Sequence, residues 1–121
     1  MKTSYFAQLK RLPAELAISI ARWKPRWFHG REYLALAPPP RLLDAWKKGL
    51  LTEEQYAEVY RKDVLSRLNA ADVVVDLPEG AYLLCYEKPE DFCHRHLVAE
   101  WLRENGYECE EERFATRSKP S

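Results

Sequence analysis

Residues 83 to 102, LLCYEKPEDFCHRHLVAEWL, place five chemically capable side chains close together: Cys85, Glu87, Cys93, His94 and Arg95. An arginine guanidinium presents a fixed pair of donors to phosphate or carboxylate. Histidine and glutamate can transfer protons near neutral pH, and a cysteine thiolate is a nucleophile. We therefore expect Arg95 and Cys85 to bind a ligand and Glu87, His94 and Cys93 to be catalytic.

The elements around these residues predict where such a ligand would bind. Residues 81–87, AYLLCYE, form an apolar run of strand length between Gly80 and Pro89, which predicts a buried central strand. A helix should follow, with Asp91 as its N-cap and an apolar face that includes Leu97 and Trp101. Ligands of open α/β sheets bind beyond the carboxyl ends of strands, where helix N-termini attract anions. The pattern predicts an anion pocket for a phosphorylated small molecule or nucleotide.

Structural roles compete with the chemical ones. Cys85 and Cys93 both continue apolar patterns and would then be core residues. Glu87 and Arg95 would then be an ion pair that ties the strand to the helix, and His94 a hydrogen-bonded packing residue. In that case the protein is an interaction module whose cluster is only structural.

A zinc site made of Cys85, Cys93, His94 and Cys109 is the alternative use of the same residues. Tetrahedral sites favour paired ligands two to four residues apart, and adjacent residues on a helix point about 100° apart. We therefore predict no metal site. An odd number of cysteines, in a chain with no apolar N-terminal signal, predicts reduced thiols in the cytoplasm, and no apolar run is long enough to span a membrane.

The segment from residue 22 to residue 31 is rich in basic and aromatic side chains. Residues 1–48 contain ten Lys or Arg and three Asp or Glu, whereas residues 49–121 contain nine and sixteen. One interpretation is a roof over the anion pocket, with Arg22 among the ligand-binding residues together with Tyr60 of a later helix. A second is a nucleic-acid-binding loop that stacks bases on Trp23, Trp27 and Phe28. A third is a lid whose tryptophans plug the core.

Strands and helices alternate along the rest of the chain. We expect strands at 3–6, 15–23 and 107–111, a helix over 40–49, and a second helix from a Thr52–Gln55 capping box to about residue 69. Residues 70–77 fit a helix or a strand. The alternation predicts an α/β protein, a small three-layer Rossmann-like sandwich with a short, mostly parallel sheet. Residues 1–112 would form a single domain and residues 113–121 a flexible polar tail.

Three motifs resemble a known family. The segments LLCYEK, FCHRHLVAEWL and GYECEE are similar to the domain-of-unknown-function 488 (DUF488) family, in particular to a small variant found in bacteria and their phages. The resemblance implies a Rossmann-like fold and marks Cys85, Glu87, Cys93, His94 and Arg95 as motif positions. It implies neither a reaction nor a cofactor, only suggestions of nucleotide or nucleic-acid roles, so whether the chain is an enzyme stays open. Many members carry Asp-Val-Arg after the first strand, where this chain has ISIARW, so Arg22 would replace the arginine and the aspartate has no equivalent.

Overall fold

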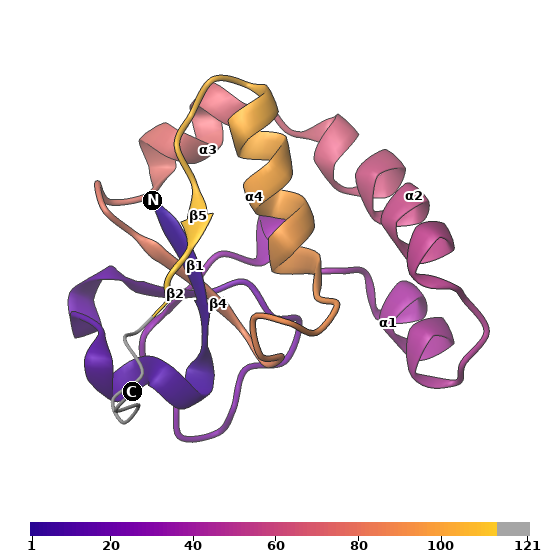
Figure 1. Cartoon of the computed structure of the whole chain (residues 1–121), viewed down its shortest axis with the longest axis horizontal. Coiled ribbons are helices and arrows are strands. Elements are labelled where there is room, and N and C mark those ends of the chain that lie inside the picture. Colours follow the sequence, from indigo (N-terminus) through magenta and orange to yellow (C-terminus); the bar gives the residue numbers. More distant parts are fainter. Residues whose placement is uncertain (114–121) are drawn as a thin grey trace, which may run out of the picture.

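The computed structural model describes residues 1–113, which form a five-stranded parallel sheet with helices packed on it (Figure 1). The strand order is β3-β2-β4-β1-β5. The strands are β1 (Lys2–Tyr5), β2 (Ala17–Ser19), β3 (Arg31–Glu32), β4 (Tyr82–Cys85) and β5 (Glu110–Glu111). The predicted small α/β fold and parallel sheet are confirmed, and β4 is the central strand as expected.

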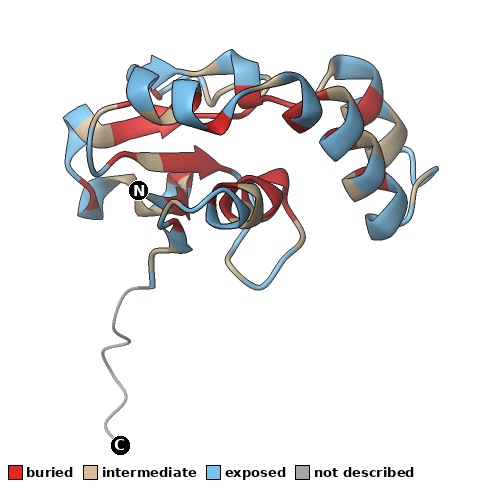
Figure 2. Cartoon of the chain, turned by 90° about the horizontal axis from the view of Figure 1, so that it is seen from above, coloured by how far each residue is buried: buried red, intermediate tan, exposed pale blue. Residues whose placement is uncertain are grey.

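Alternation along the strands divides the core between the two faces of the sheet. Ile18 and Leu83 lie side by side and belong to the larger core cluster, whereas Ala17 and Leu84 belong to the smaller one. Neighbouring residues of a strand point to opposite faces, so the two clusters lie on opposite sides of the sheet. Figure 2 shows buried residues on the strands and on the inward sides of the helices.

All four α-helices within residues 1–113 contribute to the larger cluster, and side-chain caps begin two of them. These helices are α1 (Pro40–Lys47), α2 (Glu53–Asp63), α3 (Ala70–Asp76) and α4 (His94–Glu104). Thr52 and Gln55 form the predicted capping box before α2, and the Asn69 side chain accepts a hydrogen bond from the backbone of Asp72 at the start of α3. Residues 70–77, for which the sequence allowed a helix or a strand, therefore form a helix that begins at this cap.

Within residues 1–113, no α-helix contributes a buried residue to the smaller cluster. Phe6, the first residue of the 3-10 helix η1 (Phe6–Arg11), packs there with Leu12, which follows the helix, and with Phe28 from the 22–31 segment. The layer on this face therefore consists of 3-10 helix and loop. Three further 3-10 helices link the elements within residues 1–113, namely η2 (Ala14–Leu16), η3 (Leu34–Leu36) and η4 (Leu65–Arg67).

Several predicted boundaries differ from the structure. The strand expected over 15–23 is only β2, because the Ser19 hydroxyl accepts a hydrogen bond from the backbone of Ala21 and the chain turns there. Helix α2 ends at Asp63, and the predicted cap at Asp91 is wrong because α4 begins after Cys93, whose side chain makes no cap bond. The predicted tail falls almost entirely on residues 114–121, outside the described part. None of the helices within residues 1–113 is long and apolar enough to cross a membrane.

Candidate functional site

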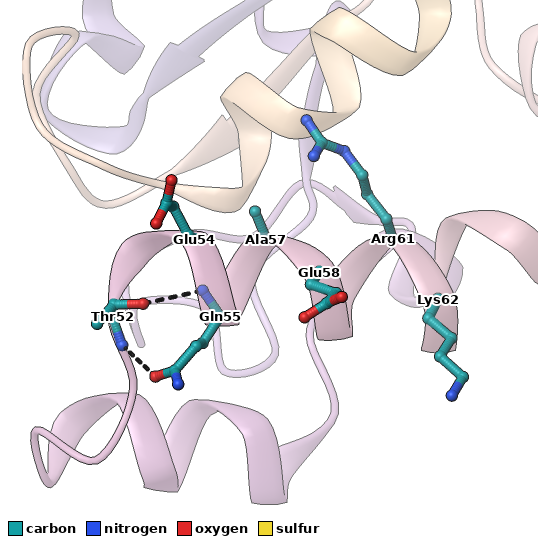
Figure 3. Close-up of a pocket in the computed structure, with 7 residues that line it drawn as sticks. All are labelled: Thr52, Glu54, Gln55, Ala57, Glu58, Arg61 and Lys62. Atoms are coloured by element: carbon teal, nitrogen blue, oxygen red, sulfur yellow. Dashed lines mark hydrogen bonds between the residues drawn. The ribbon is translucent and has the colours of Figure 1, made fainter.

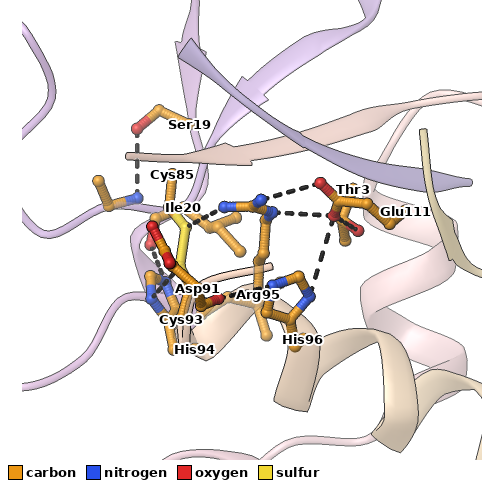
Figure 4. The surroundings of a disulfide bond; sticks show 12 residues. Thr3, Ser19, Ile20, Cys85, Asp91, Cys93, His94, Arg95, His96 and Glu111 are labelled. Carbon is orange, nitrogen blue, oxygen red and sulfur yellow. Dashed lines mark hydrogen bonds and ion pairs between the residues drawn. A yellow bond between two sulfur atoms is a disulfide. The ribbon is translucent and has the colours of Figure 1, made fainter. Parts of the chain in front are cut away.

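The end of β4 and the start of α4 are joined by a disulfide between Cys85 and Cys93 (Figure 4). The expectation of reduced thiols is wrong for this pair in the structure. Sequence spacing alone did not show that the turn of residues 86–92 folds back and brings the two sulfur atoms together. Cys109 has a free, buried thiol, and burial raises its pKa to about 11.

His94 is buried beside this sulfur pair. Its Nε2 atom lies 2.7 Å from the carbonyl oxygen of Ile20, and its Nδ1 atom lies 3.8 Å from the Sγ atom of Cys93. Burial, followed by the nearby charge of Arg95, lowers the pKa of His94 to about 4, although the Ile20 carbonyl opposes the shift. The ring is therefore neutral at pH 7. Because Nε2 must donate to the carbonyl, the lone pair of Nδ1 points towards the sulfur.

Arg95 is fully buried, and its guanidinium is engaged inside the protein (Figure 4). Its Nε and Nη2 atoms donate to the two carboxylate oxygens of Glu111, at 3.0 and 2.8 Å, and Nη1 lies 3.1 Å from the Sγ atom of Cys85. The Thr3 hydroxyl donates to the same carboxylate, and the Tyr5 ring lies 5.7 Å from the guanidinium carbon. The partner of Arg95 is thus Glu111 rather than Glu87.

The ligand-type atoms of Cys85, Cys93 and His94 all lie within 4.8 Å of one another. A metal site was not expected because Cys93 and His94, as consecutive residues of one helix, would point in different directions. Cys93 instead has extended backbone angles, φ −158° and ψ 148°, and His94 is the first residue of the helix. The two side chains therefore converge instead of diverging.

A pocket of about 350 Å³ opens next to this cluster. It brings together four of the predicted site residues, Arg22, Cys85, Glu87 and His94, with side chains that our sequence reasoning did not place there. The full lining is Ala21, Arg22, Trp23, Pro38, Leu43, Lys47, Cys85, Tyr86, Glu87 and His94. The predicted site residues Cys93, Arg95 and Tyr60 are not among these lining residues. Tyr60 is buried behind His94, with ring centroids 5.6 Å apart, and donates to the carbonyl oxygen of Leu36.

The 22–31 segment contributes the rim of this pocket. Arg22 donates from Nε to the carbonyl oxygen of Pro38 at 2.9 Å, which fixes the guanidinium at the pocket wall. Trp23 and Trp27 are 57% and 56% exposed, so the interpretation as tryptophans that plug the core is wrong. Phe28 fills the core in their place, with 1% exposure.

Lys47, Tyr86 and Glu111 are the residues that the sequence analysis missed. Lys47 is in the last turn of α1, and its ammonium lies 6.0 Å from the Trp23 ring centroid. The Tyr86 hydroxyl donates to the Trp23 carbonyl oxygen at 2.7 Å. The GYECEE motif contains Glu111 and was the available signal for it, but only the pairing of β5 with β1 shows that this carboxylate faces Arg95.

A larger hollow of about 1070 Å³ lies along α2 (Figure 3). All of its lining residues come from Thr52 to Lys62, and most carry exposed polar side chains, two of which form the capping box. One helix surface and its cap therefore make this hollow, and it contains none of the motif residues. We place the candidate site at the 350 Å³ pocket.

Comparison with known protein families gives a match over most of the chain. Residues 4–106 match the family model DUF488-N3a, described as the active DUF488-N3 subclade. No curated protein and no solved structure matches the chain.

Proposed function

The chain belongs to the DUF488 family, and from this premise we propose that its 350 Å³ pocket binds a phosphorylated small molecule of the nucleotide type. One observation carries the proposal: two cationic side chains and two exposed aromatic rings line the same pocket, next to the family's motif residues Cys85, Glu87 and His94. Phosphate and a planar base are the two groups that such a lining recognises.

The cations come from Arg22 and Lys47. With Glu87 they give the pocket a formal charge of +1, which favours an anionic ligand. The bond to Pro38 holds the Arg22 guanidinium in place before any ligand binds, so little side-chain entropy is lost on binding. Lys47 supplies an ammonium from the last turn of α1, 6.0 Å from the Trp23 ring centroid. These two residues take the phosphate-binding role that the sequence suggested for Arg95, whose donors face Glu111 and Cys85.

The aromatic rings come from Trp23 and Tyr86, which are 57% and 50% exposed. The hydrogen bond between the Tyr86 hydroxyl and the Trp23 backbone joins the two residues at the rim. Exposed rings held in this way provide a flat apolar surface on which a base can stack, worth about 1–3 kcal/mol per base. The pocket volume falls in the usual range of small-molecule sites, about 300–1,000 Å³.

Glu87 is the group that we propose for proton transfer or for binding a ligand hydroxyl, because it is the carboxylate in the lining. The family description calls the subclade active, which agrees with a catalytic use of the pocket. Cys93, the nucleophile expected from the sequence, is bonded to Cys85 in this structure and would have to be reduced first.

Calorimetric titration of nucleoside mono-, di- and triphosphates, with inorganic phosphate as a separate arm, tests this proposal. We expect Lys47→Ala to weaken nucleotide binding about tenfold, the value of one charge-assisted contact. Lys48→Ala is the matched control, since Lys48 is the next residue and pairs with Asp44 outside the lining. No binding of any nucleotide, or equal losses in the two variants, would overturn the proposal.

Binding of single-stranded nucleic acid is the second candidate, because Trp27 is as exposed as Trp23 on the same segment. Trp23→Ala and Trp27→Ala separate the two functions. A small ligand in the pocket depends on Trp23 alone, since Trp27 is not in the lining. A strand laid along the segment depends on both rings and binds more weakly as salt rises.

A further inference from the structure

We propose that the reduced protein binds one thiophilic divalent cation, of the Zn²⁺ type, through Cys85 Sγ, Cys93 Sγ and His94 Nδ1. This inference goes beyond the proposed function, since it requires no nucleotide. It rests on three side chains from two elements whose ligand atoms lie within 4.8 Å of one another. Two thiolates and an imidazole are a donor set that Zn²⁺ prefers.

One of the distances between these atoms already fits a metal site. Zn–S bonds of about 2.3 Å and Zn–N bonds of about 2.0–2.1 Å place a sulfur and a nitrogen about 3.6 Å apart in a tetrahedral site. His94 Nδ1 is already 3.8 Å from Cys93 Sγ. The Cα atoms of Cys85 and Cys93 are 7.5 Å apart, farther than the roughly 4.4–6.8 Å that disulfides usually span. This backbone spacing leaves room for an ion between the two sulfur atoms once they are thiolates.

Neighbouring groups already orient the ligands as they do around known metal centres. The Ile20 carbonyl holds the Nε2–H of His94, which leaves Nδ1 as the metal-binding nitrogen. Arg95 donates to Cys85 Sγ at 3.1 Å, a bond that also stabilises a metal-bound thiolate. The charges balance, since two thiolates neutralise a divalent cation and Glu111 neutralises Arg95.

Loading the site requires reduction. A dithiol or phosphine reductant supplies two electrons, and with two protons the S–S bond becomes two thiols. Each thiol then loses its proton to solvent as its sulfur binds the cation. Three protein ligands leave the fourth position of a tetrahedral ion to an exchangeable ligand. Cys85 and His94 line the 350 Å³ pocket, so that ligand would come from the pocket side.

Cobalt binding by the full chain tests the site. The protein is reduced with a phosphine under argon and titrated with Co²⁺ in the absence of nucleotide. We expect one Co²⁺ per chain, with a sulfur-to-cobalt charge-transfer band, the visible bands of a tetrahedral ion, and displacement by Zn²⁺. Cys93→Ser should weaken binding by more than about 100-fold, since even the loss of an outer-shell partner costs 10–100-fold. The matched control, Cys109→Ser, should keep the site.

Wild-type protein that shows no charge-transfer band, or Cys109→Ser that loses binding as fully as Cys93→Ser, would overturn the inference. Should Cys93→Ser fail to fold, the reduced wild-type chain still decides, because Zn²⁺ must then raise its melting temperature, and an unchanged temperature counts against the site. The assay contains no nucleotide, so failure of the metal site is separate from failure of the proposed pocket function.

Discussion

The bond between Arg95 and Glu111 gives the sharpest stability prediction. We expect Glu111→Gln to lower the free energy of unfolding by about 3 kcal/mol, at the lower end of the 3–5 kcal/mol for breaking a buried ion pair. The Glu111 carboxylate accepts hydrogen bonds from Arg95 Nε, Arg95 Nη2 and the Thr3 hydroxyl. Glutamine keeps the shape and one acceptor oxygen, but its amide opposes one guanidinium donor. Arg95, with 0% side-chain exposure, is then a buried cation without its counter-ion.

The next residue provides the matched control. Glu112 also forms an ion pair, with Lys2 at 2.8 Å, but the Lys2 side chain is 50% exposed. Solvent screens an exposed pair, so Glu112→Gln should lower the free energy of unfolding by much less than Glu111→Gln does. The two variants remove the same charge one position apart and therefore differ mainly in burial.

Urea unfolding followed by fluorescence measures both variants under reducing and non-reducing conditions. At an m-value of about 1–3 kcal/mol/M, the expected loss for Glu111→Gln moves the midpoint down by about 1–3 M. The loss should persist in high salt, because a buried pair is screened little. If the two variants unfold within about 0.5 kcal/mol of each other, the buried pair does not stabilise the junction of β1, β5 and α4 as we argue.

Two further predictions concern buried polar groups. Tyr60→Phe should cost about 1–3 kcal/mol in urea unfolding, because it leaves the buried Leu36 carbonyl without the donor that now lies 2.6 Å away; Tyr33→Phe, which removes the exposed bond to Asp76, should cost less than about 1 kcal/mol. Burial raises the pKa of the Cys109 thiol to about 11, from 9.0 in the unfolded chain. As the pH rises above about 9, the unfolded chain therefore loses the thiol proton before the folded protein does. The buried thiol contributes its full stabilisation below pH 9, and this contribution is lost as the pH rises towards 11. Wild-type protein should therefore lose about 1 kcal/mol more than Cys109→Ala between pH 7.5 and pH 10, and parallel curves would contradict this assignment.

The elements of the fold could be predicted because their signals are local. The apolar run at 81–87, the capping box at Thr52 and the helix end near Gly106 each depend on a few neighbouring residues. The boundaries that failed depend on side-chain bonds and backbone angles that the hydrophobic pattern does not contain. β2 ends at Ser19, whose hydroxyl accepts a hydrogen bond from the backbone of Ala21, and α4 begins only after Cys93, which has extended backbone angles.

The candidate site could be predicted only in part, for a geometric reason. Alternation along β4 and the position of α4 bring Cys85 and His94 to the same sheet edge, as the pattern indicated. Arg95 pairs with Glu111 because β5 pairs with β1. The sequence spacing between Glu87 and Arg95 gives no information about this strand pairing. The side chains of Cys93 and His94 point to the same place because Cys93, just before the helix, has an extended backbone. A prediction that uses the helical repeat for both residues therefore misplaces them.

The strand order has a consequence for how the chain folds. β1 and β2 both lie within the first 19 residues, yet neither pairs with the other, since β4 lies between them. The sheet therefore cannot begin to assemble around its centre until residues 82–85 are present, and its edge pairs residues 2 and 3 with residues 110 and 111. Such long-range pairings make folding slow and leave β1 unpaired meanwhile, whereas β2 can pair early with β3. During synthesis, the residues before β4 should therefore stay incompletely folded and open to chaperone binding. Folding should be completed only after Glu111 has been synthesised and pairs with Arg95.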